Sequence, residues 1–256
     1  MNRGDHLATI AEVLAGTTGA KVPYPPIGIR ELEVVRSEMV GTGLLRLTLG
    51  GPELAGFESH APDEHVRLVY PDADGTLRLP ERDGFSLKWP RPLPISREYT
   101  VRRYDAEAGE LDLDFALHDG GYASDWAQAA TVGTRVHVAG PPGGVVVPWT
   151  YDRYLLAGDI TALPAIARWL EMMPAAAAGW VFVEITDPSQ EIELTVPEGV
   201  EVRCCTAVTS QPVTRICSSR QYGRSPCPKV SASTPGSPVR PPVSSPFADS
   251  CATNSA

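Results

Sequence analysis

The chain has 256 residues, 43% of them hydrophobic, and a formal net charge of −9. This length allows one large or two modest domains with a sizeable core. The acidic balance argues against nucleic acid as a partner, because most of the surface would repel a phosphate polymer. No apolar run reaches the length of a membrane span. The N-terminus also lacks a charged region followed by a long apolar stretch, so we expect a cytoplasmic protein.

The first 26 residues are expected to form a short helix and a linker. Residues 7–15 carry apolar side chains at helical spacing and are followed by Gly16, which is typical of an amphipathic helix that ends there. Pro25 and Pro26 then interrupt the chain.

Residues 27–149 read as an all-β domain. Short alternating runs separated by turn residues predict a six-stranded antiparallel barrel, a fold that closes its own edges. The expected strands are residues 30–36, 44–49, 65–70, 98–104, 111–118 and 135–139.

The pattern changes to α/β in residues 150–204. Residues 154–158 and 180–185 are predicted buried strands, residues 162–173 a helix and residues 200–204 a third strand. A strand, helix, strand order at this spacing predicts a parallel sheet of the nucleotide-binding kind. The predicted fold is therefore a barrel followed by a partial, three-stranded α/β domain.

Residues 205–256 have a different composition, rich in Ser, Pro and Arg. Such a segment buries too little apolar area to offset its ordering entropy, so we expect disorder. All five cysteines lie after residue 203, so the body has no disulfide framework and no thiolate metal site. The tail cysteines match no zinc spacing and the five histidines are scattered along the chain, so no metal site is predicted. The cysteines are Cys204, Cys205, Cys217, Cys227 and Cys251.

The run from residue 97 to residue 103 carries the first chemical signal. On a single strand, alternate side chains face opposite sides. One face would hold Tyr99, Val101 and Arg103, and the other Glu98, Thr100 and Arg102. This arrangement offers an aromatic ring, a hydroxyl and guanidinium groups in fixed directions. The alternative is that these residues only decorate a sheet, since Tyr and Thr are good strand formers.

The second signal is the run from His118 to Trp126, where a strand is expected to end and a helix to begin near Ser124. Free N–H groups and the helix dipole favour an anion at such a place. A flavin ring needs an aromatic face and a hydrogen-bond donor, and its diphosphate needs Arg and backbone N–H groups. The two runs together predict a flavin site. The alternatives are an ordinary helix cap around Gly121 and a half-buried strand-end role for His118.

The third signal, residues 157–166, is weaker. A strand runs into a polar turn with Asp159 or Thr161 available as a helix cap and Pro164 in the first helical turn. With Gly158 as its one glycine, this is not a dinucleotide fingerprint. By itself it indicates a crossover connection.

Taken together, these runs resemble the siderophore-interacting protein family, the ferric-siderophore reductases among the ferredoxin-reductase-like flavoproteins. The resemblance covers residues 28 to 204, and the combination of the runs at 97–100 and 158–166 is the specific part. The matching stretches are residues 50–57, 63–68, 97–102, 114–118, 139–144 and 158–166.

The resemblance implies a barrel that binds FAD and an α/β domain that receives NADH or NADPH. It implies Arg97 on the pyrophosphate, Tyr99 beside the flavin ring and Thr100 near the reactive nitrogen, with Tyr99 and Thr100 as the catalytic candidates and Val101 also in the cofactor site. The residues implied on the phosphate and adenosine side are His118, Gly121, Ala123 and Ser124. Those implied where nicotinamide and flavin meet are Asp159, Thr161 and Ala162.

The implied activity is the reduction of a ferric siderophore by FAD with electrons from a nicotinamide, which releases ferrous iron because hard oxygen donors hold it less tightly. Lys88 and Arg91 are candidates for an anion-binding pocket, or belong to a solvated loop. A flavin-binding or siderophore-binding module without turnover stays open, as does a non-functional product. A reductase that serves an iron–sulfur protein is a further alternative, although no cluster-binding cysteines are attached.

After residue 204 the sequence departs from the family pattern, as expected for translation in a shifted reading frame or for a true alternative tail. Three strands make a poor half of a doubly wound sheet. We therefore expect uncovered apolar side chains at Leu155, Ile166, Phe182 and Val202, an unstable second domain and impaired activity.

Overall fold

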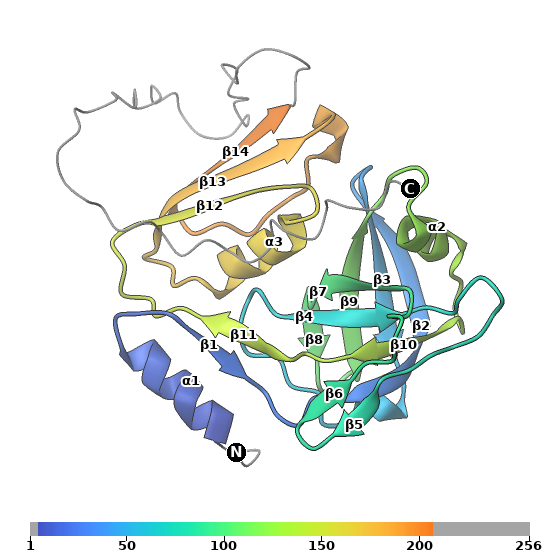
Figure 1. Ribbon diagram of the computed structural model, residues 1–256. Helices are drawn as coiled ribbons and strands as arrows, with labels where there is room; N and C mark the ends of the chain where they lie inside the picture. Colours follow the sequence, from blue (N-terminus) through green and yellow to red (C-terminus); the bar gives the residue numbers. More distant parts are fainter. Residues whose placement is uncertain (1–4, 207–256) are drawn as a thin grey trace, which may run out of the picture. The chain divides into compact units, whose positions relative to one another are not determined.

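The computed structural model describes residues 5–206, and its largest element is a seven-stranded antiparallel sheet (Figure 1). The strands follow the order β7-β4-β10-β2-β3-β9-β8. All six predicted strand regions lie in this sheet. The strands are β2 (Ile29–Val40), β3 (Leu44–Gly50), β4 (His65–Val69), β7 (Ser96–Thr100), β8 (Arg103–Asp105), β9 (Glu110–Ala116) and β10 (Arg135–Ala139).

The core of this sheet comes from apolar side chains that lie opposite one another on neighbouring strands. Leu47 pairs with Leu113 and Leu49 with Leu111 across β3 and β9, and all four are fully buried. Such cross-strand apolar pairs stabilise a sheet and fix its register, because a slip by one residue would turn them towards water.

The prediction of one strand over residues 98–104 is wrong, because the chain changes partners at Val101. The N–H of Val101 donates to the carbonyl of Glu64, next to β4, at 2.8 Å. The N–H of Arg102 donates to the carbonyl of Asp112 on β9 at 3.0 Å. The segment is therefore two strands, β7 and β8, at opposite ends of the sheet, and the predicted alternation of side chains stops at Val101.

The two end strands of the sheet, β7 and β8, follow one another directly in the chain. The sheet must therefore curl to bring its two ends together. Among residues 5–206, no hydrogen-bonded ladder joins β7 to β8. The antiparallel sheet is thus observed, whereas the closed six-stranded barrel stays a prediction.

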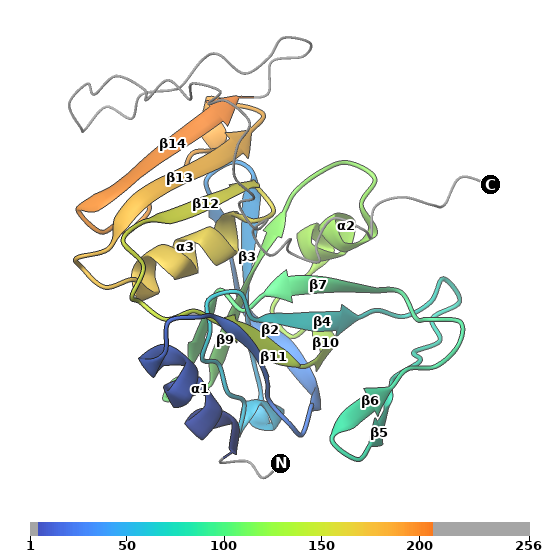
Figure 2. The same ribbon diagram turned by 60° about the vertical axis from the view of Figure 1, so that its left-hand side comes forward.

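Smaller elements surround this sheet. Helix α1 (Asp5–Ala15) begins two residues before the predicted helix and packs against a two-stranded sheet of β1 (Ala20–Pro23) and β11 (Gly143–Val146) (Figures 1 and 2). The others are the short helix η1 (Pro52–Leu54), the hairpin of β5 (Glu81–Asp83) and β6 (Ser86–Lys88), and helix α2 (Tyr122–Ala129). None of the helices described is long and apolar enough to cross a membrane.

The predicted α/β region forms a parallel three-stranded sheet in the order β12-β13-β14. Helix α3 (Leu163–Met172) covers one face of it (Figure 2). The strands are β12 (Tyr154–Asp159), β13 (Ala178–Ile185) and β14 (Gly199–Thr206), and a short helix, η2 (Pro188–Gln190), lies between the last two.

The expectation of uncovered apolar side chains is met in part. Leu155 is 67% exposed, because alternate residues of β12 face away from α3. The prediction that β12 is buried along its whole length is therefore wrong. Phe182 and Val202 are half-buried. Ile166, in contrast, is only 5% exposed, because it lies on the face of α3 that packs against the sheet.

The predicted boundaries at residues 26/27, 149/150 and 204/205 stay predictions, and both sheets lie within one compact unit of the chain. Strand β14 continues to Thr206, past the predicted start of the tail. The expected disorder of the rest of that tail concerns residues that lie outside those described.

A buried ion pair joins α3 to the antiparallel sheet. The Arg168 guanidinium donates to the carbonyl of Val101 at 2.8 Å, to Oγ of Ser59 at 2.6 Å and to Oε2 of Glu64 at 3.3 Å. The Glu64 side chain is fully buried and that of Arg168 is 9% exposed. Glu64 also accepts from Oγ of Ser59 at 2.7 Å and from the N–H groups of His60 and Ala61.

Replacing Arg168 by Met should therefore lower the free energy of unfolding by about 3–5 kcal/mol, because it leaves the Glu64 carboxylate buried without its cation. Urea denaturation of the full chain measures this. The control Arg135→Met breaks an exposed pair with Glu31 and should change stability by less than about 1 kcal/mol. Adding Glu64→Gln to Arg168→Met should recover part of the loss; equal losses in the two single Arg variants would contradict the assignment.

Candidate flavin pocket

One pocket, with a volume of about 310 Å³, gathers most of the predicted cofactor residues. Strand β7 and the start of α2 form two of its sides, and the loop after β9 connects them. Its lining consists of Arg97, Tyr99, Ala116, His118, Gly120, Gly121, Tyr122, Ala123 and Ser124. Six of these residues belong to the predicted site.

Arg97 is the cation of this pocket. Its guanidinium donates to the carbonyl of Ser96 at 2.8 Å and has no carboxylate partner among residues 5–206. The other arginines of the run are engaged: Arg102 forms a two-pronged pair with Glu171, and Arg103 pairs with Asp112. Of the guanidinium groups that the sequence offers here, Arg97 alone is therefore available to an anion in the pocket.

Tyr99 provides an aromatic surface next to Arg97. Residues 97 and 99 share one face of β7, and the Tyr99 ring packs on the buried Phe115 ring, with centroids 4.2 Å apart. Burial raises the pKa of the Tyr99 hydroxyl above its usual range, although Tyr70 and the charge of Arg97 partly oppose this. The hydroxyl therefore stays protonated at neutral pH and can donate a hydrogen bond.

The first turn of α2 also lines this pocket. The helix begins at Tyr122 after Gly121, and no side chain caps it, so its first N–H groups lack intrahelical partners. The predicted start at Ser124 is two residues late. Ser124 is buried in the first turn, and its Oγ accepts from the N–H of His118 at 3.1 Å.

A side chain at Gly121 would displace the imidazole of His118. A Cβ at this position would lie 2.0 Å from Cε1 of His118. His118 itself is exposed, which removes the alternative of a half-buried strand-end histidine. A glycine here lets the imidazole lie over the start of α2.

These groups fit a flavin dinucleotide. An unpaired guanidinium and an uncapped helix N-terminus suit the diphosphate, and a half-buried tyrosine suits a flat aromatic ring. The fit rests on side chains and backbone groups that face one pocket.

Five predicted site residues do not line this pocket. Thr100 faces the other side of β7 from Tyr99, and the side chain of Val101 is fully buried while its N–H and carbonyl bond to Glu64 and Arg168. Asp159, Thr161 and Ala162 form the turn that starts α3 instead.

That turn is held by its own hydrogen bonds. Oδ1 of Asp159 accepts from the N–H of Thr161 at 2.8 Å and from its Oγ1 at 2.5 Å. Gly158 allows the close approach, since a Cβ there would lie 2.4 Å from that of Ala162. The turn matches the predicted crossover connection.

Three lining residues were missed, namely Ala116, Gly120 and Tyr122. Tyr122 is 42% exposed, and its hydroxyl donates to the carbonyl of Pro71 at 3.1 Å. The sequence signal that could have identified Tyr122 as a lining residue is its large aromatic side chain directly after two glycines.

Two family models match consecutive stretches of the chain. Residues 33–145 match the family model described as the siderophore-interacting FAD-binding domain, and residues 151–219 match that of the siderophore-interacting protein. The second match runs to residue 219, so the predicted end of the resemblance at residue 204 is too early.

Two curated relatives are ferric reductases by name. The chain is 38% identical over 176 residues to ferric vibriobactin reductase ViuB of Vibrio cholerae, covering 68% of this chain and 65% of that protein. It is 42% identical over 149 residues to the NADPH-dependent ferric-chelate reductase of Escherichia coli, covering 58% of each. The chain thus spans less than two thirds of the length of these relatives.

A solved relative shares the fold. The crystal structure of a siderophore utilization protein from T. fusca superimposes with a TM-score of 0.70 at 38% identity, covering 76% of this chain and 75% of that one. Because two family models match consecutive stretches and this structure matches over three quarters of its length, the chain belongs to the siderophore-interacting protein family, with an FAD-binding domain in its first half.

Proposed function

We propose that this protein is an FAD-dependent oxidoreductase that reduces ferric siderophores with electrons from NADPH. The observation that carries the proposal is the pocket in which Arg97, Tyr99 and the uncapped start of α2 face one another. The named activities of the Vibrio cholerae and Escherichia coli relatives support the substrate class, and the second of these supports NADPH as donor.

Each group has a distinct role in the proposal. Arg97 and the N–H groups of α2 hold the diphosphate, His118, Gly121, Ala123 and Ser124 line its other side, and Tyr99 positions the ring and shields it from water. FAD, when bound, accepts two electrons together from a nicotinamide and returns them singly. Thr100 follows Tyr99 at the end of β7, and because its side chain faces the other side of the strand, we propose that its backbone contacts the ring edge.

The proposed nicotinamide contact is the turn of Asp159, Thr161 and Ala162. It lies at the carboxyl end of β12, where ligands of parallel sheets bind. The proposed contact with the anionic iron chelate is Lys88 with Arg91, two exposed cations that have no ion pair in the described part of the chain. Reduction weakens the hold of hard oxygen donors on the iron, so the metal is released.

Arg97→Gln should weaken FAD binding by about 10- to 150-fold, the equivalent of a lost charge-assisted hydrogen bond of about 1.5–3 kcal/mol. Quenching of flavin fluorescence on titration with the full chain measures the dissociation constant. Arg135→Gln is the control, because Arg135 is paired with Glu31 on β2 and does not line the pocket. Equal FAD affinity in the Arg97 variant and the wild type would overturn the assignment of the pocket.

Turnover needs a separate test, because a flavin-binding module would pass the first one. Under anaerobic conditions, the FAD-loaded chain should bleach with NADPH, at a rate lowered by the impairment that the sequence predicts, and added ferric siderophore should restore the oxidised spectrum while a ferrous chelator develops colour. At limiting FAD, the Arg97→Gln chain should produce ferrous iron at least about tenfold more slowly than the wild type. A yellow wild-type protein that neither bleaches nor yields ferrous iron would instead be a binding module.

A further inference from the structure

A cluster of metal-ligand side chains lies outside the flavin pocket, between helix α1 and the loop before β4. Nε2 of His6 lies 2.7 Å from Oε2 of Glu58, and Nε2 of His60 lies 3.6 Å from the same oxygen. All three ligand atoms lie within 4.8 Å of one another. The five histidines are scattered in the sequence, but the fold brings two of them to one carboxylate.

The cluster leaves buried nitrogen atoms without partners. Within residues 5–206, neither Nδ1 of His6 nor Nε2 of His60 has a hydrogen-bond partner, and the His6 side chain is only 1% exposed. A buried polar atom that makes no hydrogen bond costs about 1–3 kcal/mol. An ordinary hydrogen bond to Glu58 accounts for His6 Nε2, whereas His60 Nε2, at 3.6 Å from the same oxygen, lies beyond hydrogen-bond distance of it.

A shared cation accounts for this arrangement. Two ligand atoms about 2.1 Å from a tetrahedral Zn²⁺ lie about 3.4 Å apart, close to the 3.6 Å between His60 and Glu58. The 2.7 Å contact between His6 and Glu58 would need to open by about 0.7 Å to reach this separation, through a shift of the Glu58 carboxylate. Two imidazoles and one carboxylate suit divalent transition metals such as Zn²⁺ and Fe²⁺.

The surroundings hold these ligands in place. The Tyr24 ring lies 5.4 Å from the His6 ring and 5.2 Å from the His60 ring, centroid to centroid. Between Glu58 and His60, the Oγ of Ser59 accepts from Arg168 and donates to Glu64. The loop that carries two of the three ligands is therefore fixed by the buried ion pair, as a preformed metal site requires.

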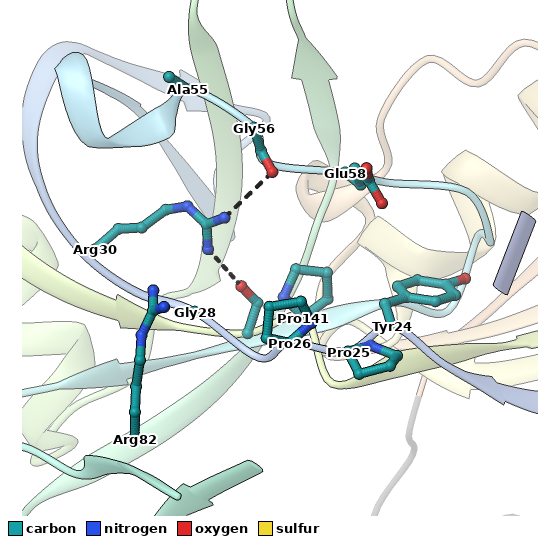
Figure 3. A pocket seen from close by; sticks show the side chains of 11 residues that line it. Tyr24, Pro25, Pro26, Gly28, Arg30, Ala55, Gly56, Glu58, Arg82 and Pro141 are labelled. Carbon is teal, nitrogen blue, oxygen red and sulfur yellow. Dashed lines mark hydrogen bonds between the residues drawn. The ribbon is translucent and has the colours of Figure 1, made fainter. Parts of the chain in front are cut away.

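The cluster can be reached from solvent. A pocket of about 230 Å³ is lined by Glu58 and Tyr24 at one end and by the guanidinium groups of Arg30 and Arg82 at the other (Figure 3). The Arg30 guanidinium is held there by the carbonyls of Gly56 and Gly140 (Figure 3). An ion can thus approach Glu58 through this opening, and water can fill the remaining coordination positions.

We propose that His6, Glu58 and His60 bind one divalent transition-metal ion, which ties helix α1 to the loop at residues 58–60. Because the ligands are 52 residues apart in the chain, the ion closes a long loop, and its binding free energy adds to the stability of the fold. This proposal is independent of the flavin pocket, whose lining shares no residue with the cluster.

The test uses the full chain without an affinity tag, stripped of metal by a chelator and titrated calorimetrically with Zn²⁺. The wild type should bind one ion that His60→Gln and Glu58→Gln lose or bind at least about 10- to 100-fold more weakly. His137→Gln is the matched control, because His137 also lies near a glutamate, with 4.0 Å to Glu31, but outside the cluster. Cysteines elsewhere can add sites, and these should persist in every variant.

Two further readouts use His60→Gln, because His6 is buried and its replacement would disturb the packing of α1. Zn²⁺ should raise the melting temperature of the wild type and of His137→Gln but not of His60→Gln. Co²⁺ should give a visible spectrum of nitrogen and oxygen ligation that disappears in His60→Gln. Equal Zn²⁺ stoichiometry and affinity in His60→Gln and His137→Gln would overturn the proposal, as would a wild type that binds no ion.

Discussion

The hydrogen bonds of the buried Arg168 guanidinium hold together the segments that carry both candidate sites. It meets the carboxylate of Glu64, the hydroxyl of Ser59 and the carbonyl of Val101, so helix α3, the loop before β4 and the end of β7 share one cation. A buried charge is tolerated only when its hydrogen bonds are satisfied. Each of these three segments is therefore held to a narrow range of positions by the same group.

Arg168 positions the two candidate sites through different segments of the chain. Strand β7 carries Arg97 and Tyr99 into the flavin pocket, and its last residues are fixed where Val101 accepts from Arg168. The loop with Glu58 and His60 is fixed through Ser59, which lies between them. The flavin pocket and the ligand cluster thus have a common anchor, although they share no residue.

The sequence predicted what depends on neighbours in the chain. The strands, helix α3 and the glycine step before α2 follow from local alternation and punctuation, and Arg97, Tyr99 and Gly121 were found because strand and helix starts fix their directions. What failed depends on distant partners. The break at Val101 is set by carbonyls of Glu64 and Asp112, the pairing of Arg102 by Glu171, and the meeting of His6 with His60 by the packing of α1. No periodicity encodes these contacts.

The passage of the chain from β7 to β8 at Val101 and Arg102 also limits pairing of the sheet edges with strands of other molecules. A sheet normally ends in strands whose free N–H and carbonyl groups invite pairing with a neighbouring molecule. Here the end strands β7 and β8 have only five and three residues, and the covalent chain runs directly from one to the other. The same two residues that divide the predicted strand therefore leave the antiparallel sheet without a long open edge, and aggregation through this sheet is disfavoured.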